Sequence, residues 1–236
     1  MTKVPTICVR ELKSYFYSPI AYIVMTVFLV ISGYFFAVIL SHSREATLRY
    51  SMQNMPIILL FVTPIITMRL LAEESKTGTM ETLMTAPVSD FEVVFGKFLA
   101  ALGFYVAMLV PTLAYVGFLR WVGRPDYGPI IASYIGLVLM GGLFISIGLF
   151  ASSLTRNQIV AAMIAFAMLL LFWVLGFAAG RSGTAISKFI EYVGIFEHFD
   201  TFRKGLVDSR DVIYYLSGTA FMLFLTVKVV ESRKWR

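Results

Sequence analysis

The sequence predicts an all-α integral membrane protein with six transmembrane helices. Of its 236 residues 58% are hydrophobic and only 14% are charged, and the mean hydropathy is +0.81. Soluble domains are about a quarter charged. Six apolar runs approach or exceed the roughly 20 residues that cross a bilayer. No polar segment between them is long enough for a soluble domain, so we expect a single transmembrane domain over 1–236.

The net charge of +6 does not indicate nucleic-acid binding. The basic residues stand at the ends of apolar runs and form no patch with interleaved aromatic residues, which is typical of charges that flank membrane spans. The single cysteine, Cys8, excludes an internal disulfide and a cysteine-based metal site. We therefore expect the lipid bilayer as a partner and no nucleic acid.

The chain begins with an amphipathic segment, residues 1–19, which we predict to be an elbow helix lying in the membrane interface. Apolar side chains recur there at helical spacing with Arg10 and Lys13 on the other face, and Ser18-Pro19 ends the helix. The first span is predicted at 20–41. It is longer than the apolar core of a signal peptide and lacks a small-residue cleavage site after it, so we expect it to be retained.

A charged block at 73–90 separates the second and third apolar runs. Gly78 breaks the helix that arrives from the second run, a short amphipathic piece follows, and Pro87 ends it. Ser89 and Glu92 then form an S-x-x-E capping box that starts the third run. The pattern predicts a short, stiff segment between two spans, on which a partner in the aqueous phase can act.

The remaining spans are predicted at 55–72, 91–119, 127–155, 158–180 and 212–230. Arg69, Lys97 and Lys228 are predicted to anchor span ends by extending to the interface. Arg69 can also pair with Glu73 at i,i+4, and Lys228 lies beside Glu231.

Glycines are frequent in the fourth and fifth spans. The fourth contains Gly136, Gly141, Gly142 and Gly148. The fifth contains a G-x-x-x-G motif that ends at Gly180. Small residues let helices approach closely, either within one chain or between two chains.

Residues 183–208 are predicted to form an amphipathic hairpin at the outer membrane surface, broken at Gly194. His198 lies there beside two acidic residues, and we favour a polar interfacial face over a metal or proton site. A Cu(I) site of His42 with Met52 and Met55 is also disfavoured, because methionine commonly fills apolar helices. We expect no metal site.

Six spans place both termini on the same side of the membrane. Basic residues are in excess on that side once those between Arg181 and Arg210 are set aside. The positive-inside rule then predicts cytoplasmic termini and a cytoplasmic 73–90 block.

No catalytic or cofactor-binding residue is expected in this chain. The phosphate-loop pattern is absent, since Gly96-Lys97 is followed by Phe98, and neither a G-x-S-x-G elbow nor an H-E-x-x-H helix occurs. The spans carry almost no ionisable residue near their centres, where ion-driven carriers place them. Whatever drives this protein is therefore expected to lie in another chain.

The block that starts near Arg69 resembles the signature region of the type 2 ABC exporter permease family. The matching residues are Arg69, Glu73, Glu74, Gly78, Thr79, Glu81, Leu83, Pro87, Gly96 and Lys97. The N-terminal RELKSYFYSPIAYI resembles the family's interfacial elbow helix, with Arg10, Glu11 and Lys13 as its charged residues. The segment from Phe196 to Ser217 is similar to the segment that precedes the last span in small permeases of the gliding-motility type.

The resemblance implies the membrane subunit of an ATP-driven exporter in the inner or plasma membrane. Residues 73–90 would be a coupling helix that docks on a separate cytoplasmic ABC ATPase, which binds ATP and Mg²⁺. Two permease copies and two ATPase chains would form one transporter. The coupling residues would be Glu73, Glu74, Gly78, Thr79, Glu81, Leu83 and Pro87.

Two other functions stay open. The chain could be a non-transporting scaffold that binds a cytoplasmic partner through 73–97, or an ion-driven carrier. The sequence does not identify the substrate. The spans offer aromatic and small residues but no charged pocket, which weakly favours a lipid-like or otherwise apolar cargo.

Overall fold

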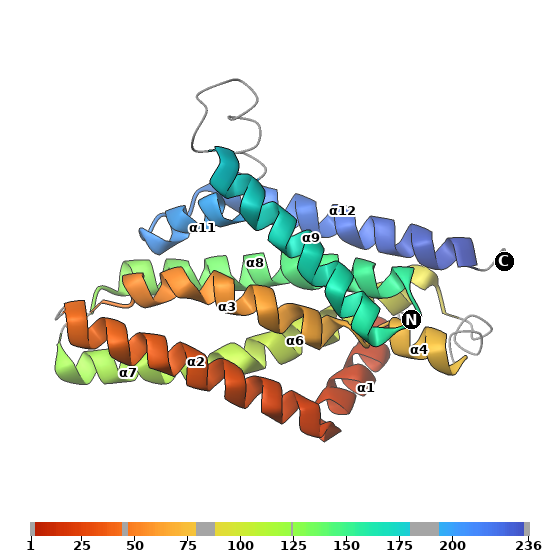
Figure 1. Cartoon of the computed structure of the whole chain (residues 1–236), viewed down its shortest axis with the longest axis horizontal. Coiled ribbons are helices and arrows are strands. Elements are labelled where there is room, and N and C mark those ends of the chain that lie inside the picture. The colour runs from red at the N-terminus through yellow and green to blue at the C-terminus, as the bar shows by residue number, and fades with distance from the viewer. Residues whose placement is uncertain (1–2, 44–46, 79–87, 124, 180–193, 234–236) are drawn as a thin grey trace.

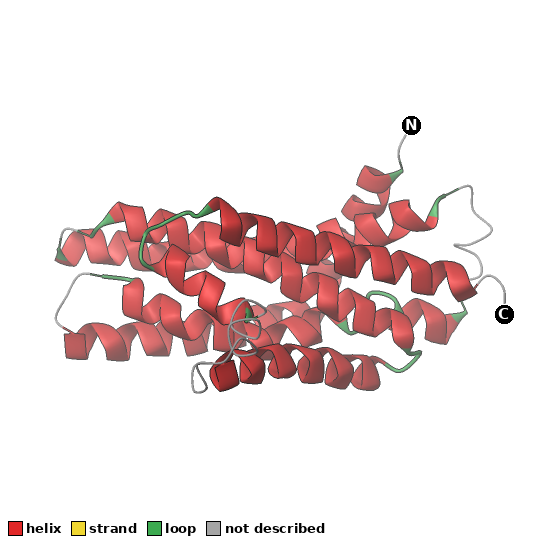
Figure 2. Cartoon of the chain, turned by 90° about the horizontal axis from the view of Figure 1, so that it is seen from above, coloured by secondary structure: helices red, strands yellow, loops and turns green. Residues whose placement is uncertain are grey.

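The computed structural model describes residues 3–43, 47–78, 88–123, 125–179 and 194–233. Within these ranges all regular structure is helical (Figure 2). The helices are α1 (Val4–Tyr17), α2 (Pro19–Ser43), α3 (Arg49–Thr67), α4 (Ala72–Thr77), α6 (Asp90–Leu109), the 3₁₀ turn η1 (Val110–Thr112), α7 (Leu113–Val122), α8 (Tyr127–Leu154), α9 (Gln158–Ala179), α11 (Ile195–Arg203) and α12 (Ser209–Arg233).

In the described part of the chain six helical stretches are long and apolar enough to cross a membrane, which confirms the predicted all-α membrane class. They form an elongated bundle in which consecutive stretches run in opposite directions (Figure 1). As a result α1, α4, the start of α6 and the end of α12 lie at the same end of the bundle, which we call the α4 end.

The centre of the bundle consists of α3, α6 and α8, whereas in α2, α9 and α12 only about a fifth of the residues are buried. Three glycines of α8 allow α11, α6 and α3 to pack closely against this helix. A Cβ at Gly136 would lie 2.7 Å from the Phe202 ring, and Cβ atoms at Gly141 and Gly148 would overlap Tyr105 and Thr67. These three glycines therefore serve close approach within this chain. Gly180 of the predicted G-x-x-x-G motif lies outside the described residues.

The third span is not one continuous α-helix. The sequence predicts a single stretch at 91–119, but α6 ends at Leu109 and gives way to the 3₁₀ turn that contains Pro111. Proline has no N–H to donate and its ring collides with the carbonyl one turn earlier, so the helix restarts as α7. The predicted capping box at the other end of α6 is confirmed, with both Ser89–Glu92 hydrogen bonds present.

The second half of the predicted outer hairpin is α11, whose apolar face packs on α8 and α9 at the end of the bundle opposite α4 (Figure 1). Residues 183–193, the first half of the predicted hairpin, lie outside the described residues. His198 is not on a polar interfacial face. It is buried, and its Nδ1 lies 2.6 Å from Asp211 Oδ1 of α12, because a buried imidazole needs a polar partner.

Candidate coupling site

The chain leaves the second span through a turn at residues 68–71 and continues into the short helix α4. We call residues 68–77 the junction segment. The α-helix of the predicted span 55–72 therefore ends at Thr67, before the predicted end at residue 72. Gly78 closes α4 with φ of +75°, a left-handed conformation that glycine adopts without steric conflict, as the predicted helix break requires.

Ser152, near the end of α8, holds the turn of the junction segment. Its Oγ accepts hydrogen bonds from the backbone N–H groups of Leu71 (3.1 Å) and Ala72 (3.0 Å) and donates one to the Met68 carbonyl (3.0 Å). The broken helix leaves these buried backbone groups without intrahelical partners, and one hydroxyl satisfies three of them. The junction segment is thereby tied to the centre of the bundle.

A buried ion cluster ties α4 to two further helices. Lys97 of α6 is only 1% exposed, and its Nζ lies 2.8 Å from Glu74 Oε1 of α4 and 3.3 Å from Glu11 Oε1 of α1. Arg10 adds a contact of 2.9 Å to Glu11. Lys97 is therefore not the interfacial anchor that the sequence predicts, because two carboxylates within reach compensate its charge inside the protein.

The basic residues of the cluster favour the ionised form of Glu11. Burial by itself raises the pKa of Glu11, but the Lys97 ammonium and the Arg10 guanidinium outweigh it and hold that pKa below its ordinary value. The second oxygen of Glu74, Oε2, is buried and has no hydrogen-bond partner among the described residues.

Arg69, in the turn of the junction segment, contacts the elbow and not Glu73. Its guanidinium donates to Ser18 Oγ (3.1 Å) and to the Ser14 carbonyl (3.3 Å), and lies 4.7 Å over the centre of the Tyr15 ring. The i,i+4 pair that the sequence suggests is not formed. These contacts fix the elbow against the end of the second span.

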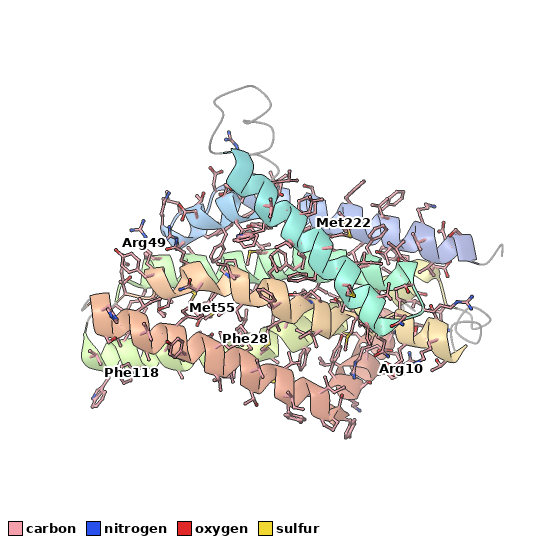
Figure 3. The ribbon with its side chains drawn as sticks, viewed as in Figure 1. Arg10, Phe28, Arg49, Met55, Phe118 and Met222 are labelled. Atoms are coloured by element: carbon pink, nitrogen blue, oxygen red, sulfur yellow. The ribbon has the colours of Figure 1, made fainter. Side chains whose placement is uncertain are left out.

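The elbow helix α1 packs along the start of α6. A Cβ at Gly96 would lie 2.9 Å from the Ile7 side chain, so only glycine allows the two helices to come this close. The backbone N–H of Lys3 donates to Glu92 Oε1 of α6 at 3.1 Å. Arg10 lies near α4 and Arg49 at the opposite end of the molecule (Figure 3).

The predicted site residues divide into three groups. Glu74, Arg10 and Glu11 meet at the ion cluster, whereas Glu73 and Lys13 are exposed. Lys228 is exposed, and its Nζ lies 2.8 Å from Glu231 Oε2, the acidic neighbour noted in the sequence. Four predicted coupling residues lie outside the described residues, namely Thr79, Glu81, Leu83 and Pro87.

Sequence reasoning missed Ser152, Ser18 and Tyr15 as parts of this site. Serine at the end of an apolar run is common, and no local pattern links Ser152 to a turn about eighty positions earlier. The contacts of this site attach one short helix, α4, to three others. Hydrogen bonds and ion pairs fix it to α1, α6 and α8. Among the described residues no group of three or more His, Cys, Asp or Glu side chains is arranged to hold a metal.

The six apolar helices among the described residues, with a polar segment fixed between two of them, define a multi-pass membrane protein. The model of the family described as ABC-2 family transporter protein matches residues 37–196, more than half of the chain, and the chain belongs to this family. It is therefore an ABC-2 type permease, a membrane component of a transporter. A search of curated proteins finds no match.

Proposed function

We propose that this permease is driven by a separate cytoplasmic ABC ATPase, which docks on residues 73–90 and powers export of a substrate. ATP and Mg²⁺ would be bound by the ATPase and not by this chain. In this proposal the coupling residues are Glu73, Glu74 and Gly78, together with Thr79, Glu81, Leu83 and Pro87.

The observation that supports the proposal best is the attachment of α4. Ser152 joins its start to α8, and the Lys97–Glu74 pair joins its middle to α6. The same cluster reaches the elbow through Glu11. A displacement of α4 would thus be transmitted directly to several helices, whereas a loosely attached loop would absorb it. Such an attachment suits a segment on which a motor protein pushes.

The orientation and assembly follow from the same proposal. Basic residues favour the side of the termini, so the α4 end would face the cytoplasm, where an ATPase is available. A second permease copy would complete the transporter, because a pair of ATPase subunits offers two docking surfaces. The membrane would be the inner or plasma membrane.

The experiment is co-expression of the chain with a candidate ABC ATPase encoded by a neighbouring gene. The complex should copurify from detergent, and reconstitution into liposomes should change the ATP turnover of the ATPase. Glu81→Ala combined with Leu83→Ala should abolish this change while the complex still assembles. Lys204→Gln, an exposed side chain at the opposite end, is the matched control and should leave turnover unchanged.

Two results would count against the proposal. If the ATPase neither copurifies nor alters its turnover, the proposed motor is wrong. If Glu81→Ala with Leu83→Ala abolishes assembly alone, and the assembled wild type never alters turnover, the chain acts as a scaffold. Transport that follows an ion gradient in ATPase-free liposomes would favour a carrier.

A further inference from the structure

Arg69 forms no ion pair with a carboxylate within 4.0 Å among the residues that the structure describes. Its contacts are a hydroxyl, a backbone carbonyl and the Tyr15 ring, all of which are neutral. A guanidinium has five N–H donors in a planar fork that matches a phosphate group. Arg69 therefore keeps both charge and donors for an anion.

Two pockets meet at Arg69. One, of about 100 Å³, lies beside α2 and α3 and is lined mainly by apolar side chains such as Ala21 and Val24. The other, of about 270 Å³, is polar and lies on the side of α4. Tyr15, Arg69 and Glu73 line both. The guanidinium thus stands at the border between apolar and polar space, which matches an amphiphilic ligand.

The apolar pocket lies at the ends of two helices that are long and apolar enough to cross a membrane, α2 and α3. Ile20 is at the start of α2 and Ile65 is in the last turn of α3, and both line the pocket with side chains that are 50% and 40% exposed. Apolar side chains exposed at a span end meet lipid chains, and basic groups between spans bind lipid headgroups. A ligand can therefore reach Arg69 from within the bilayer.

Besides Arg69, the polar pocket is lined by the carboxylates of Glu11, Glu73 and Glu74. Glu73 is exposed and lines the pocket. Glu74 Oε2 adds a buried oxygen without a hydrogen-bond partner among the described residues, while Lys97 is already held by Glu74 Oε1 and Glu11. A purely anionic headgroup would be repelled here, whereas a headgroup with a phosphate and an ammonium would find an opposite charge for each.

We propose that this pocket binds a bilayer phospholipid with an ethanolamine headgroup. The phosphate binds Arg69, the primary ammonium faces Glu73, and the start of an acyl chain occupies the apolar pocket. Choline binds less well because its ammonium has no N–H to donate, and glycerol brings no positive charge. The occupant is a lipid, not a soluble phosphate ester, because the apolar pocket adjoins the site. The binding is independent of the proposed ATPase.

The test is native mass spectrometry of the delipidated full-length protein in detergent. It is titrated with phosphatidylethanolamine, phosphatidylcholine and phosphatidylglycerol of identical acyl chains. The wild type should bind the ethanolamine lipid about tenfold more tightly than the other two, as expected for one charge-assisted hydrogen bond. Arg69→Gln should weaken binding of all three lipids. Glu73→Gln should abolish only the preference for ethanolamine.

Arg120→Gln, at an exposed position of α7, should change nothing. Glu73 is also exposed, so Glu73→Gln keeps the test decisive even if Arg69→Gln fails to fold. Equal binding of the three lipids, tighter binding of phosphatidylglycerol, or an unaltered preference in Glu73→Gln would overturn the proposal. Displacement by soluble glycerophosphoethanolamine at equal concentration would overturn the role of the apolar pocket.

Discussion

Lys97 Nζ lies 2.8 Å from Glu74 Oε1, and the lysine side chain is almost completely buried. This pair joins the first turns of the third span to the short helix that follows the second. Separated charges inside a protein are unfavourable, so the pair holds the two segments in one arrangement more firmly than an exposed pair could. Lys97 belongs to the Gly96-Lys97 pair that resembles the family signature, and it directly contacts Glu74, a predicted coupling residue.

Replacing Lys97 by methionine should destabilise the protein strongly. The change leaves two carboxylates without their shared cation, and loss of one partner of a buried pair reduces the free energy of unfolding by about 3 kcal/mol or more. The measurement is the apparent melting temperature in detergent. Lys97→Met combined with Glu74→Gln should recover part of the loss, since Glu11 retains Arg10.

Lys204→Met provides the comparison for this prediction. Lys204 pairs with Asp200 at 2.6 Å, but its side chain is 50% exposed, and pairs of this kind contribute about 1 kcal/mol at most. Equal losses of melting temperature in the Lys97 and Lys204 variants would show that the Lys97 cluster is not a buried structural pair.

Ser152→Ala should loosen the junction segment without disturbing the rest of the bundle. It removes the acceptor of two backbone N–H groups and the donor to the Met68 carbonyl. Unsatisfied buried groups reduce stability by about 1–3 kcal/mol. Hydrogen exchange should rise at residues 68–77. Ser146→Ala in the same helix is the control, because among the described residues Ser146 Oγ bonds to the Leu143 carbonyl of its own helix alone. Unchanged exchange in Ser152→Ala would contradict the assignment.

Much of this architecture could be predicted from the sequence because membranes impose strong local rules. Long apolar runs must become helices in a bilayer, which predicts the six spans. The capping box at Ser89 and the helix stop at Gly78 depend on neighbouring residues only. Patterns of this kind are visible without knowledge of the packing.

The contacts that hold the junction segment could not be predicted, because they depend on the tertiary arrangement. Lys97 has the sequence context of an interfacial anchor, and only the packing of α1 and α4 around it brings two carboxylates within reach. The partner of Arg69 was predicted from helical spacing, yet the helix breaks in between and the spacing no longer applies. Ser152 carries no local signal at all.

Gly148→Ala should destabilise the contact between α3 and α8. The added Cβ would overlap the Thr67 side chain, and overpacking of a tight contact reduces stability by about 1–3 kcal/mol. Gly142→Ala, in the same helix, is the matched control. Its Cβ would have nothing nearer than 3.9 Å, so it should be neutral or slightly stabilising, as alanine favours helix. The melting temperatures of the two variants in detergent should differ clearly, and equal values would contradict the packing.

Acidification should weaken the attachment of the elbow helix α1, because it protonates Glu11. Its pKa lies below the ordinary value of about 4.5 because Lys97 and Arg10 favour the ionised form over the effect of burial. A lowered pKa in the folded state means that the unfolded chain takes up the proton more readily. The stabilisation is therefore complete above the ordinary pKa and is lost as the pH falls through the folded-state pKa.

Melting temperatures between pH 6 and 3 should fall more steeply for the wild type than for Glu11→Gln, which has no carboxylate to titrate at this position. The two proteins share all other carboxylates, so the difference between their curves isolates this position, and parallel curves would show that the cluster does not depend on the charge of Glu11.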